Sequence, residues 1–229
     1  MSSAETETPT TEEEAPATDD VRDGIVADVR ARLGGAVVES HVAPGVDAWV
    51  RIAASQWGIA AQAMHDAGFV FFDYLSAIDW SINPYGKNEE PSSTPIVVPD
   101  DPKELEHGIT GGETRFQMIA RVFHPQKLVG LHLKCDVPDD TLTVPTWSKT
   151  YLGADWHERE THEMFGIVFE GHDDLRNLYL PGAFEGFPLR KDFPLLARHV
   201  KPWPGLVDVE AMPGEPDEEE GATEAEGEG

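Results

Sequence analysis

Two stretches in which apolar residues alternate place the strongest constraint on how this chain can fold. Every second residue is apolar from Phe116 to Val122, and again from Val129 to Cys135. A period of two is typical of strands that bury one face. Because the short segment 124–127 lies between them, we predict that they form a two-stranded antiparallel hairpin.

The remaining elements follow from the spacing of apolar residues and the positions of helix breakers. A helix is predicted from Asp20, as its cap, to Gly34, because apolar residues recur every four positions between them. Residues 81–113 lose all periodicity and are predicted to form an exposed loop. The other predicted elements are strands at 36–42, 48–52 and 69–78 and a helix at 56–66. This order of elements predicts an α+β fold, in which helices pack on one face of a mixed sheet.

The acidic charge of the chain is concentrated at its two ends. Of its 43 Asp and Glu residues, seven lie in 1–20 and ten in 207–229, and neither segment contains Lys or Arg. Both segments have few large apolar groups to offset the entropy of ordering, so we expect two disordered acidic tails. The rest of the chain, which begins with the predicted α+β domain at 21–155, has 26 acids against 17 bases. That balance is typical of an ordinary solvated surface, and it makes nucleic acid a poor candidate partner.

No stretch of the sequence is suited to crossing a membrane. The longest apolar stretches are shorter than the roughly 18 residues that a spanning helix needs. The acidic N-terminal segment also lacks the basic and then apolar order of a signal peptide. We therefore expect a chain that is not exported and that meets a membrane only through a partner.

The cysteine and glycine content argues against bound cofactors. Cys135 is the single Cys of the chain, whereas an iron–sulfur cluster takes about four thiolates and a structural zinc site needs Cys and His at close spacing. In an alternating strand, Cys135 is explained as a small buried hydrophobe. The glycine pairs at 34–35 and 111–112 lack the spacing of a dinucleotide fingerprint or a phosphate loop. We predict no FMN, NADH, cluster or metal site in this chain.

The run E-R-E-T-H-E-M-F, from Glu158 to Phe165, predicts a helix at 156–165. Asp155 stands where an N-terminal cap belongs, with Glu158 three residues further on. Gly166 stands where a left-handed terminator belongs. The predicted helix is therefore about three turns long.

One side of this predicted helix carries a carboxylate where an apolar residue is expected. Trp156, Glu160 and Met164 share that side, and Glu163 lies beside it. An ionised carboxylate that is desolvated without a cation costs several kcal/mol. One hypothesis is therefore that Glu160 or Glu163 pairs with an arginine. The candidate arginines are Arg176, Arg190 and one supplied by another subunit.

The alternative is a ladder of ion pairs on the helix surface. At four-residue spacing, Arg159 would meet Glu163 and Glu158 would meet His162. Such exposed pairs contribute only tenths of a kcal/mol each. The sequence leaves the buried pairing and the surface ladder equally open.

The same run invites two enzymatic interpretations. A zinc-protease site needs two histidines four residues apart on one helical face, whereas His157 and His162 are five apart and point about 140° away from each other. Hydrolysis by paired carboxylates lacks a sugar cleft and an identifiable proton-transfer partner. A freestanding hydrolase that uses Glu158, Glu160 and His162 is nevertheless a rival hypothesis. It predicts turnover by the purified chain and loss of turnover on Glu160→Gln.

The segment 166–205 combines helix breakers with many large apolar residues. It contains five prolines and five glycines, so it is neither a regular element nor a disordered tail. We predict that 156–206 consists of the helix and an extended arm laid over a partner, with polar contacts from 190–192 at its edge. The alternative is that the arm wraps over its own domain. His172 and His199 stand alone in this segment and are expected to be structural.

Residues 158–195 together resemble the signature of the C subunit of NADH-quinone oxidoreductase, which is part of respiratory complex I. In that signature, E-R-E precedes an acid and two apolar residues, followed by a spaced histidine, arginine and apolar pair. Every one of these positions is filled here. The matching residues are Glu158, Arg159, Glu160, Glu163, Met164, Phe165, His172, Arg176, Leu178 and Tyr179, followed by F-P-L-R-K-D-F-P-L at 187–195.

The resemblance implies a cofactor-free structural subunit in the peripheral arm of a proton-translocating NADH:quinone oxidoreductase. It implies partners in the D subunit, which forms the quinone site, and the cluster-bearing B subunit, with FMN and iron–sulfur clusters on other subunits. The expected location is the cytoplasmic face of the cell membrane, peripheral and within the complex. No catalytic residue is implied. The subunit-interface candidates are Glu158, Arg159, Glu160, Glu163, Phe165, His172, Arg176, Tyr179, Phe184, Arg190, Lys191 and Asp192.

Parts of the chain depart from the family pattern, namely the acidic tails and residues 81–113. These departures affect only the peripheral contacts that the resemblance implies. A rival of the same kind is the equivalent subunit of a related membrane-bound hydrogenase or dehydrogenase complex. The neighbouring subunits would distinguish the two.

Overall fold

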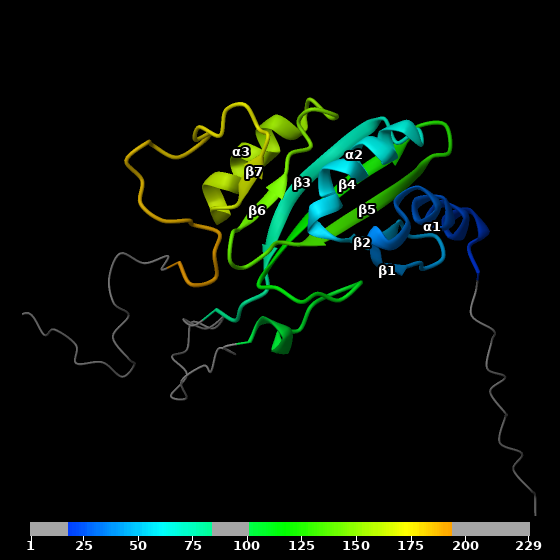
Figure 1. The fold of residues 1–229 in the computed structure, drawn as a ribbon, viewed down its shortest axis with the longest axis horizontal. Coiled ribbons are helices and arrows are strands. Elements are labelled where there is room, and N and C mark those ends of the chain that lie inside the picture. Colours follow the sequence, from blue (N-terminus) through cyan, green and yellow to red (C-terminus); the bar gives the residue numbers. More distant parts are fainter. Residues whose placement is uncertain (1–17, 84–100, 194–229) are drawn as a thin grey trace, which may run out of the picture. The chain divides into compact units, whose positions relative to one another are not determined.

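The computed structural model describes residues 18–83 and 101–193. Within them, three helices pack with a five-stranded sheet of order β1-β2-β5-β4-β3 (Figure 1). The strands are β1 (Val37–His41), β2 (Ala48–Ile52), β3 (Phe71–Asp79), β4 (Phe116–His124) and β5 (Val129–Asp136), and a separate pair is formed by β6 (Thr143–Pro145) and β7 (Val168–Glu170). The helices are α1 (Asp20–Leu33), α2 (Trp57–Asp66) and α3 (Ala154–Phe165). Of the tail predicted to be disordered at 1–20, residues 1–17 fall outside the described residues, whereas Asp19 caps α1 and Asp20 begins it. The predicted tail at 207–229, the last part of the predicted arm and His199 also fall outside them.

The sheet is mixed, as predicted. Strand β2 runs parallel to β5, whereas the β1–β2, β3–β4 and β4–β5 pairs are antiparallel. The predicted hairpin is confirmed by the β4–β5 register, in which Ala120 lies opposite Leu133. The small β6–β7 pair is parallel, and its strands are too short to have shown a periodicity in the sequence.

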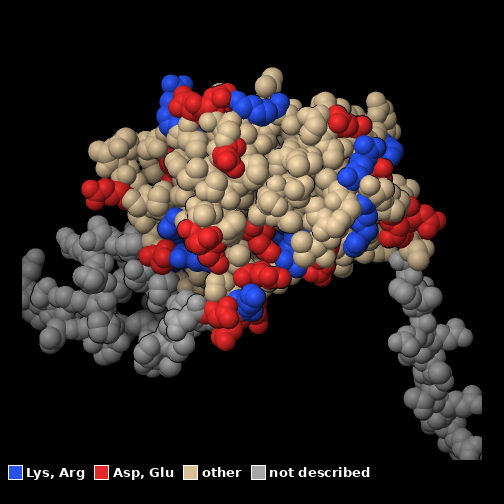
Figure 2. Space-filling model, viewed as in Figure 1, with Lys and Arg blue, Asp and Glu red and all other residues tan. Residues whose placement is uncertain are grey.

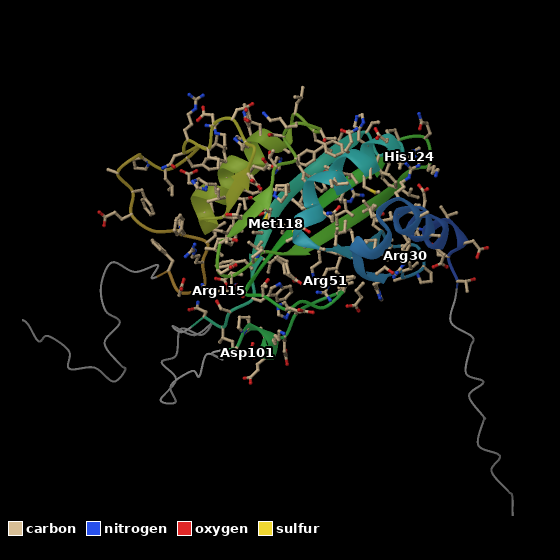
Figure 3. The ribbon with its side chains drawn as sticks, in the orientation of Figure 1. Arg30, Arg51, Asp101, Arg115, Met118 and His124 are labelled. Atoms are coloured by element: carbon tan, nitrogen blue, oxygen red, sulfur yellow. The ribbon has the colours of Figure 1, made fainter. Side chains whose placement is uncertain are left out.

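The hydrophobic core lies between the helices and one face of the sheet. Met118, at the centre of β4, is fully buried there (Figure 3). From α2, Trp57 enters the core and stacks on Trp147 with 4.6 Å between ring centroids. All three helices contribute to one cluster with the alternating apolar side chains of the strands. The predicted α+β fold, with helices on one face, is therefore confirmed.

Helix ends show where the predicted caps were right and wrong. The cap of α1 is Asp19 rather than Asp20, because the Asp19 side chain accepts a hydrogen bond from the Arg22 amide. Helix α3 begins at Ala154, and Asp155 lies in its first turn instead of capping it. Gly166 ends α3 in the left-handed conformation, with φ of 78°, as predicted.

The predicted exposed loop at 81–113 is only partly described, and the described part is partly buried. Leu105 and Thr110 are buried. Lys134, on the sheet face that lies away from the helices, donates to the carbonyl oxygens of Ile109 at 2.8 Å and Gly111 at 3.4 Å. The expectation of uniform exposure was wrong, because polar side chains of the sheet need these carbonyl acceptors.

Strand β3 is an edge strand of the sheet, and α3 lies along it (Figure 1). His157 of α3 reaches across to the strand backbone, where its Nδ1 lies 3.1 Å from the carbonyl oxygen of Leu75. The ring also contacts Phe72 edge to face, with 5.2 Å between centroids. The helix therefore occupies part of the hydrogen-bonding edge that β3 would otherwise present.

Candidate functional site

Helix α3 turns two of its four acidic residues inward. Glu158 and Glu163 are both buried, whereas Asp155 and Glu160 are partly exposed. Trp156, on the Glu160 side, is 67% exposed. The helix therefore faces its own domain with the side that carries carboxylates, and this arrangement determines the contacts described below.

Glu158 holds the turn that precedes the helix. Its carboxylate accepts hydrogen bonds from the Thr146 hydroxyl and from the Trp147 amide, each at 2.5 Å. Burial raises the pKa of Glu158 to about 7, although these two hydrogen bonds oppose the rise. This carboxyl can therefore hold a proton at close to neutral pH.

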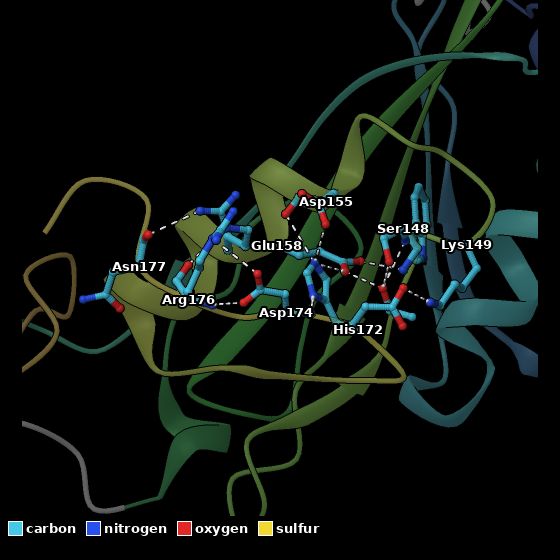
Figure 4. Close-up of polar contacts among 12 residues, drawn as sticks. Ser148, Lys149, Asp155, Glu158, His172, Asp174, Arg176 and Asn177 are labelled. Carbon is cyan, nitrogen blue, oxygen red and sulfur yellow. Dashed lines mark hydrogen bonds and ion pairs between the residues drawn. The ribbon is translucent and has the colours of Figure 1, made fainter. Parts of the chain in front are cut away.

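His172 lies beside this carboxyl and is also buried (Figure 4). Its Nε2 is 3.2 Å from Asp155 Oδ1 and 3.8 Å from Glu158 Oε2. Its Nδ1 accepts a hydrogen bond from the Asp174 amide at 3.1 Å. Because Nδ1 is an acceptor, the ring proton lies on Nε2 and points toward the two carboxyl groups. His172 thereby joins the start of the arm to α3.

Glu163 binds the backbone of the arm. Its carboxylate accepts hydrogen bonds from the amides of Leu178 at 3.1 Å, Tyr179 at 3.0 Å, and Leu180. Burial would raise the pKa of Glu163, but the three amides together lower it below its ordinary value. Arg159 adds to this lowering through its charge. The carboxylate acts as an acceptor site for three consecutive residues.

Arg159 binds carbonyl oxygens near the same segment. Its guanidinium donates to the carbonyl oxygens of Arg176 at 3.1 Å and Asn177 at 3.3 Å. Arg176 itself pairs with Asp174 at 3.2 Å and does not reach Glu160 or Glu163. Residues 176–180 are thus held through backbone donors and acceptors, which makes the contact independent of their side chains.

Among the described residues, the predicted pairing of Glu160 or Glu163 with an arginine of this chain is wrong. Glu163 takes backbone amides in place of an arginine, and Glu160 has no hydrogen-bond or ion-pair partner there. The surface ladder is wrong as well, because Glu158 faces inward and His162 instead contacts the carbonyl oxygen of Ile167 at 2.8 Å. An arginine from another subunit remains a prediction for Glu160.

A second anchor holds the far end of the arm. Asp79, at the end of β3, accepts two hydrogen bonds from Arg115, at 3.0 and 2.7 Å, and one from the Lys191 amide at 2.8 Å. The Ser81 hydroxyl donates to it as well. Burial raises the pKa of Asp79, but these donors outweigh it and lower the pKa. Arg115 also pairs with Asp192 at 3.0 Å. The Lys191 amide and the Asp192 side chain of the arm therefore both bind the Asp79–Arg115 ion pair.

Arg190 anchors the arm to the end of α3. Its Nε donates to the carbonyl oxygen of Phe165 at 2.7 Å. Its guanidinium lies over the rings of Phe187, at 4.3 Å, and Phe116, at 5.3 Å. Gly166 makes room for this arrangement, because a Cβ atom there would lie 2.5 Å from Arg190 Nη2.

The predicted interface residues differ in what they contact in the described structure. Most of them contact their own domain, as in the alternative arrangement of the arm. Tyr179 and Phe184 remain 63% and 39% exposed. Phe165 is buried in the core and is not a surface residue. The residues engaged within the domain are Glu158, Arg159, Glu163, His172, Arg190, Lys191 and Asp192.

Several residues of the site were not predicted from the sequence. Asp79 and Arg115 lie far from the helix in sequence, and Thr146 and Trp147 belong to an irregular turn. One signal was available for Asp79, since a carboxylate closes the apolar run of the third predicted strand. A charge at the end of a buried strand needs a partner.

An open hollow lies at the start of α3. The hollow, of about 400 Å³, is lined by residues that include Ser148, Lys149 and Asp173. The Ser148 hydroxyl contacts that of Thr146 at 2.7 Å, and Lys149 pairs with Asp173. No three His, Cys, Asp or Glu side chains among residues 18–83 and 101–193 are grouped as a metal ion would require.

The fold and site together define a class of protein, namely an α+β domain that fastens an irregular C-terminal arm to its last helix through buried carboxylates. A family model described as "Respiratory-chain NADH dehydrogenase, 30 Kd subunit" matches residues 50–199. The chain belongs to this family.

Relatives of known name agree with the family. The C subunit of NADH-quinone oxidoreductase from Mesorhizobium japonicum is 44% identical over 81 residues, which cover 35% of this chain and 40% of that protein. The protein of the same name from Brucella ovis is 43% identical over 83 residues, covering 36% of this chain and 41% of that protein. The matched segment thus spans about two-fifths of the length of these relatives.

A solved structure shares the fold. A chain of the membrane-bound sulfane sulfur reductase, described as an archaeal respiratory membrane complex, superposes with a TM-score of 0.56 at 20% identity. The superposition covers 76% of this chain and 86% of that one. In the part of the present chain that the structure describes, no helix combines the length and apolar character needed to cross a membrane.

Proposed function

We propose that this chain is a structural subunit of the peripheral arm of a proton-translocating NADH:quinone oxidoreductase, and that it helps to assemble the quinone-reducing module. Its proposed neighbours are the D and B subunits of that complex, and FMN and the iron–sulfur clusters belong to other subunits. The proposed location is the cytoplasmic face of the cell membrane, reached only through the complex.

The proposal rests on what the two buried carboxylates of the signature, Glu158 and Glu163, bind. Glu158 and Glu163 are occupied by backbone and hydroxyl donors of their own chain, so neither is free to act on a substrate. Glu163 holds an arm on which several large apolar side chains remain exposed. Tyr179, Phe184 and Leu189 are 63%, 39% and 52% exposed. A fixed backbone with outward aromatic and aliphatic groups is suited to anchoring in a partner's pockets.

The surface around these elements supports an interface. Figure 2 shows a face whose centre carries few charged side chains, with acidic and basic residues gathered along its margins. Depletion of charge at the centre with a polar rim is the usual composition of protein interfaces. On α3, Trp156 is 67% exposed beside Glu160, which has no described partner, and an arginine of a neighbouring subunit would satisfy that carboxylate.

The experiment is a gentle-detergent purification from membranes through a tag on this chain, with mass spectrometry and an NADH-to-quinone assay of the eluate. Recovery of the D and B subunits with activity supports the proposal. Tyr179→Ala and Leu189→Ala should reduce that recovery. Leu128→Ala is the matched control, because Leu128 is 76% exposed in the β4–β5 turn, away from the arm. A chain that emerges alone from the soluble fraction would contradict the proposal.

The same experiment tests the two rivals. Recovery with the subunits of a hydrogenase or another dehydrogenase would favour the related-complex alternative. The hydrolase alternative requires turnover by the purified chain that is lost on Glu160→Gln. Our proposal expects no turnover, and it expects the same substitution to weaken assembly.

A further inference from the structure

Arg190 is fixed in place before any partner arrives. The hydrogen bond to Phe165 occupies Nε, and the guanidinium carbon lies over the rings of Phe187 and Phe116. Its Nη1 and Nη2 atoms have no hydrogen-bond partner among the described residues. A guanidinium held in this way loses little conformational freedom when it binds a planar acceptor.

The charge of Arg190 is also unmatched within the described chain. Of the nine arginines in residues 18–83 and 101–193, six form ion pairs with Asp or Glu, and Arg190 does not. The acids that act on it from a distance, Asp79 and Asp192, are both in contact with Arg115. Burial lowers the pKa of Arg190, so its charged form is partly deprived of water.

We propose that the Nη edge of Arg190 receives a carboxylate side chain from a neighbouring subunit. This inference rests on the proposed function, because it requires an assembled complex. A carboxylate fits the site in charge, and its two oxygens match the two Nη donors of the guanidinium. Electrostatic pairing of this kind fixes the register of two surfaces, and here it would set how the end of the arm lies on its partner.

Zero-length carbodiimide coupling of the purified complex tests the contact directly. In Arg190→Lys, the new amine should couple to an Asp or Glu of another subunit, and peptide mass spectrometry would identify that residue. The wild-type complex shows how much coupling comes from the neighbouring Lys191. Arg176→Lys is the matched control on the same arm, since Arg176 pairs with Asp174 of its own chain and should couple there. Coupling at position 190 only within its own chain, or no coupling, would overturn the inference.

A charge exchange provides the second measurement. Arg190→Glu should reduce the amount of this chain retained in the complex at least tenfold, and the reciprocal substitution of the identified acid to Arg should restore it. A purely structural role for Arg190 would not be rescued in this way. If the wild-type chain assembles and Arg190→Glu is retained equally, only this inference fails. If the wild-type chain copurifies with no other member of the complex, the proposed function fails.

Discussion

Glu163 Oε2 lies 3.1 Å from the backbone nitrogen of Leu178, fifteen residues further along the chain. The next two amides point at the same carboxylate. One side chain in the last turn of α3 therefore satisfies three consecutive donors in a segment that has neither helix nor strand to satisfy them. The direction in which the arm leaves the domain depends on this contact.

Glu163→Gln should loosen the arm without unfolding the domain. One acceptor oxygen becomes a donor facing three amides, so at least one partly buried amide loses its partner, at a cost of about 1–3 kcal/mol. Hydrogen exchange at residues 178–180 should become at least tenfold faster in the purified chain. Glu160→Gln, the same change on the same helix at a residue without a described partner, should leave this exchange unaltered. Equal protection in both variants would contradict the contact.

Asp79→Asn should destabilise the chain more than any other single change in the arm's second anchor. The Asp79 side chain is 1% exposed, and its loss of charge leaves Arg115 without its main partner. Breaking a buried pair in this way costs about 3 kcal/mol, measurable as a lower urea midpoint. Asp192→Asn is the comparison, because Asp192 is 53% exposed and pairs with the same arginine. That variant should lose less than about 1 kcal/mol, and equal losses would argue against Asp79 as the anchor.

Stability should depend on pH through Glu158. The folded chain holds the Glu158 proton up to about pH 7, whereas the unfolded chain releases it near the ordinary value of 4.5. The folded state binds more protons between these values, so the free energy of unfolding should fall as pH rises through that window. Glu158→Gln cannot ionise and keeps an oxygen for the Trp147 amide.

Chemical denaturation from pH 5 to pH 8 checks this expectation. The parent chain should show a fall in stability that the Glu158→Gln variant lacks. Other groups also contribute to the pH dependence, including His132, whose pKa is lowered by burial. The difference between parent and variant isolates Glu158. An identical slope in both would show that the carboxyl is ionised throughout.

Gly166→Ala should be costly for two separate reasons. Its φ of 78° is strained for any residue with a Cβ atom, and that atom would lie 2.5 Å from Arg190 Nη2 and 2.7 Å from the Phe187 ring. We expect a loss of at least about 1–2 kcal/mol in the free energy of unfolding. Gly182→Ala, where a Cβ atom would meet nothing within 4 Å, should change stability little. A thermal melt of both variants distinguishes them.

The sheet was largely predictable because alternation reports burial directly. Strand β2 was predicted with its observed ends, and the Phe116–Val122 and Val129–Cys135 stretches pair as the pattern required. Helix α2 was predicted to within one residue. In each case the physical cause, one buried face, is local to the element and therefore visible in its own residues.

The site was less predictable because its causes are not local. The Trp147 amide needs an acceptor and finds it in Glu158, eleven residues later in the chain. The Lys191 amide finds Asp79, which lies 112 residues earlier. A sequence pattern assigns a helical glutamate to solvent or to an ion pair, and it contains no information about which distant amides lack partners.

The contact of His157 with Leu75 also affects how identical chains can meet. An uncovered edge strand is a template on which identical chains can stack. At β3 that template is interrupted by a ring that occupies a backbone carbonyl. The edge of β3 is therefore a broken template, which disfavours pairing between this strand and the same strand of an identical chain.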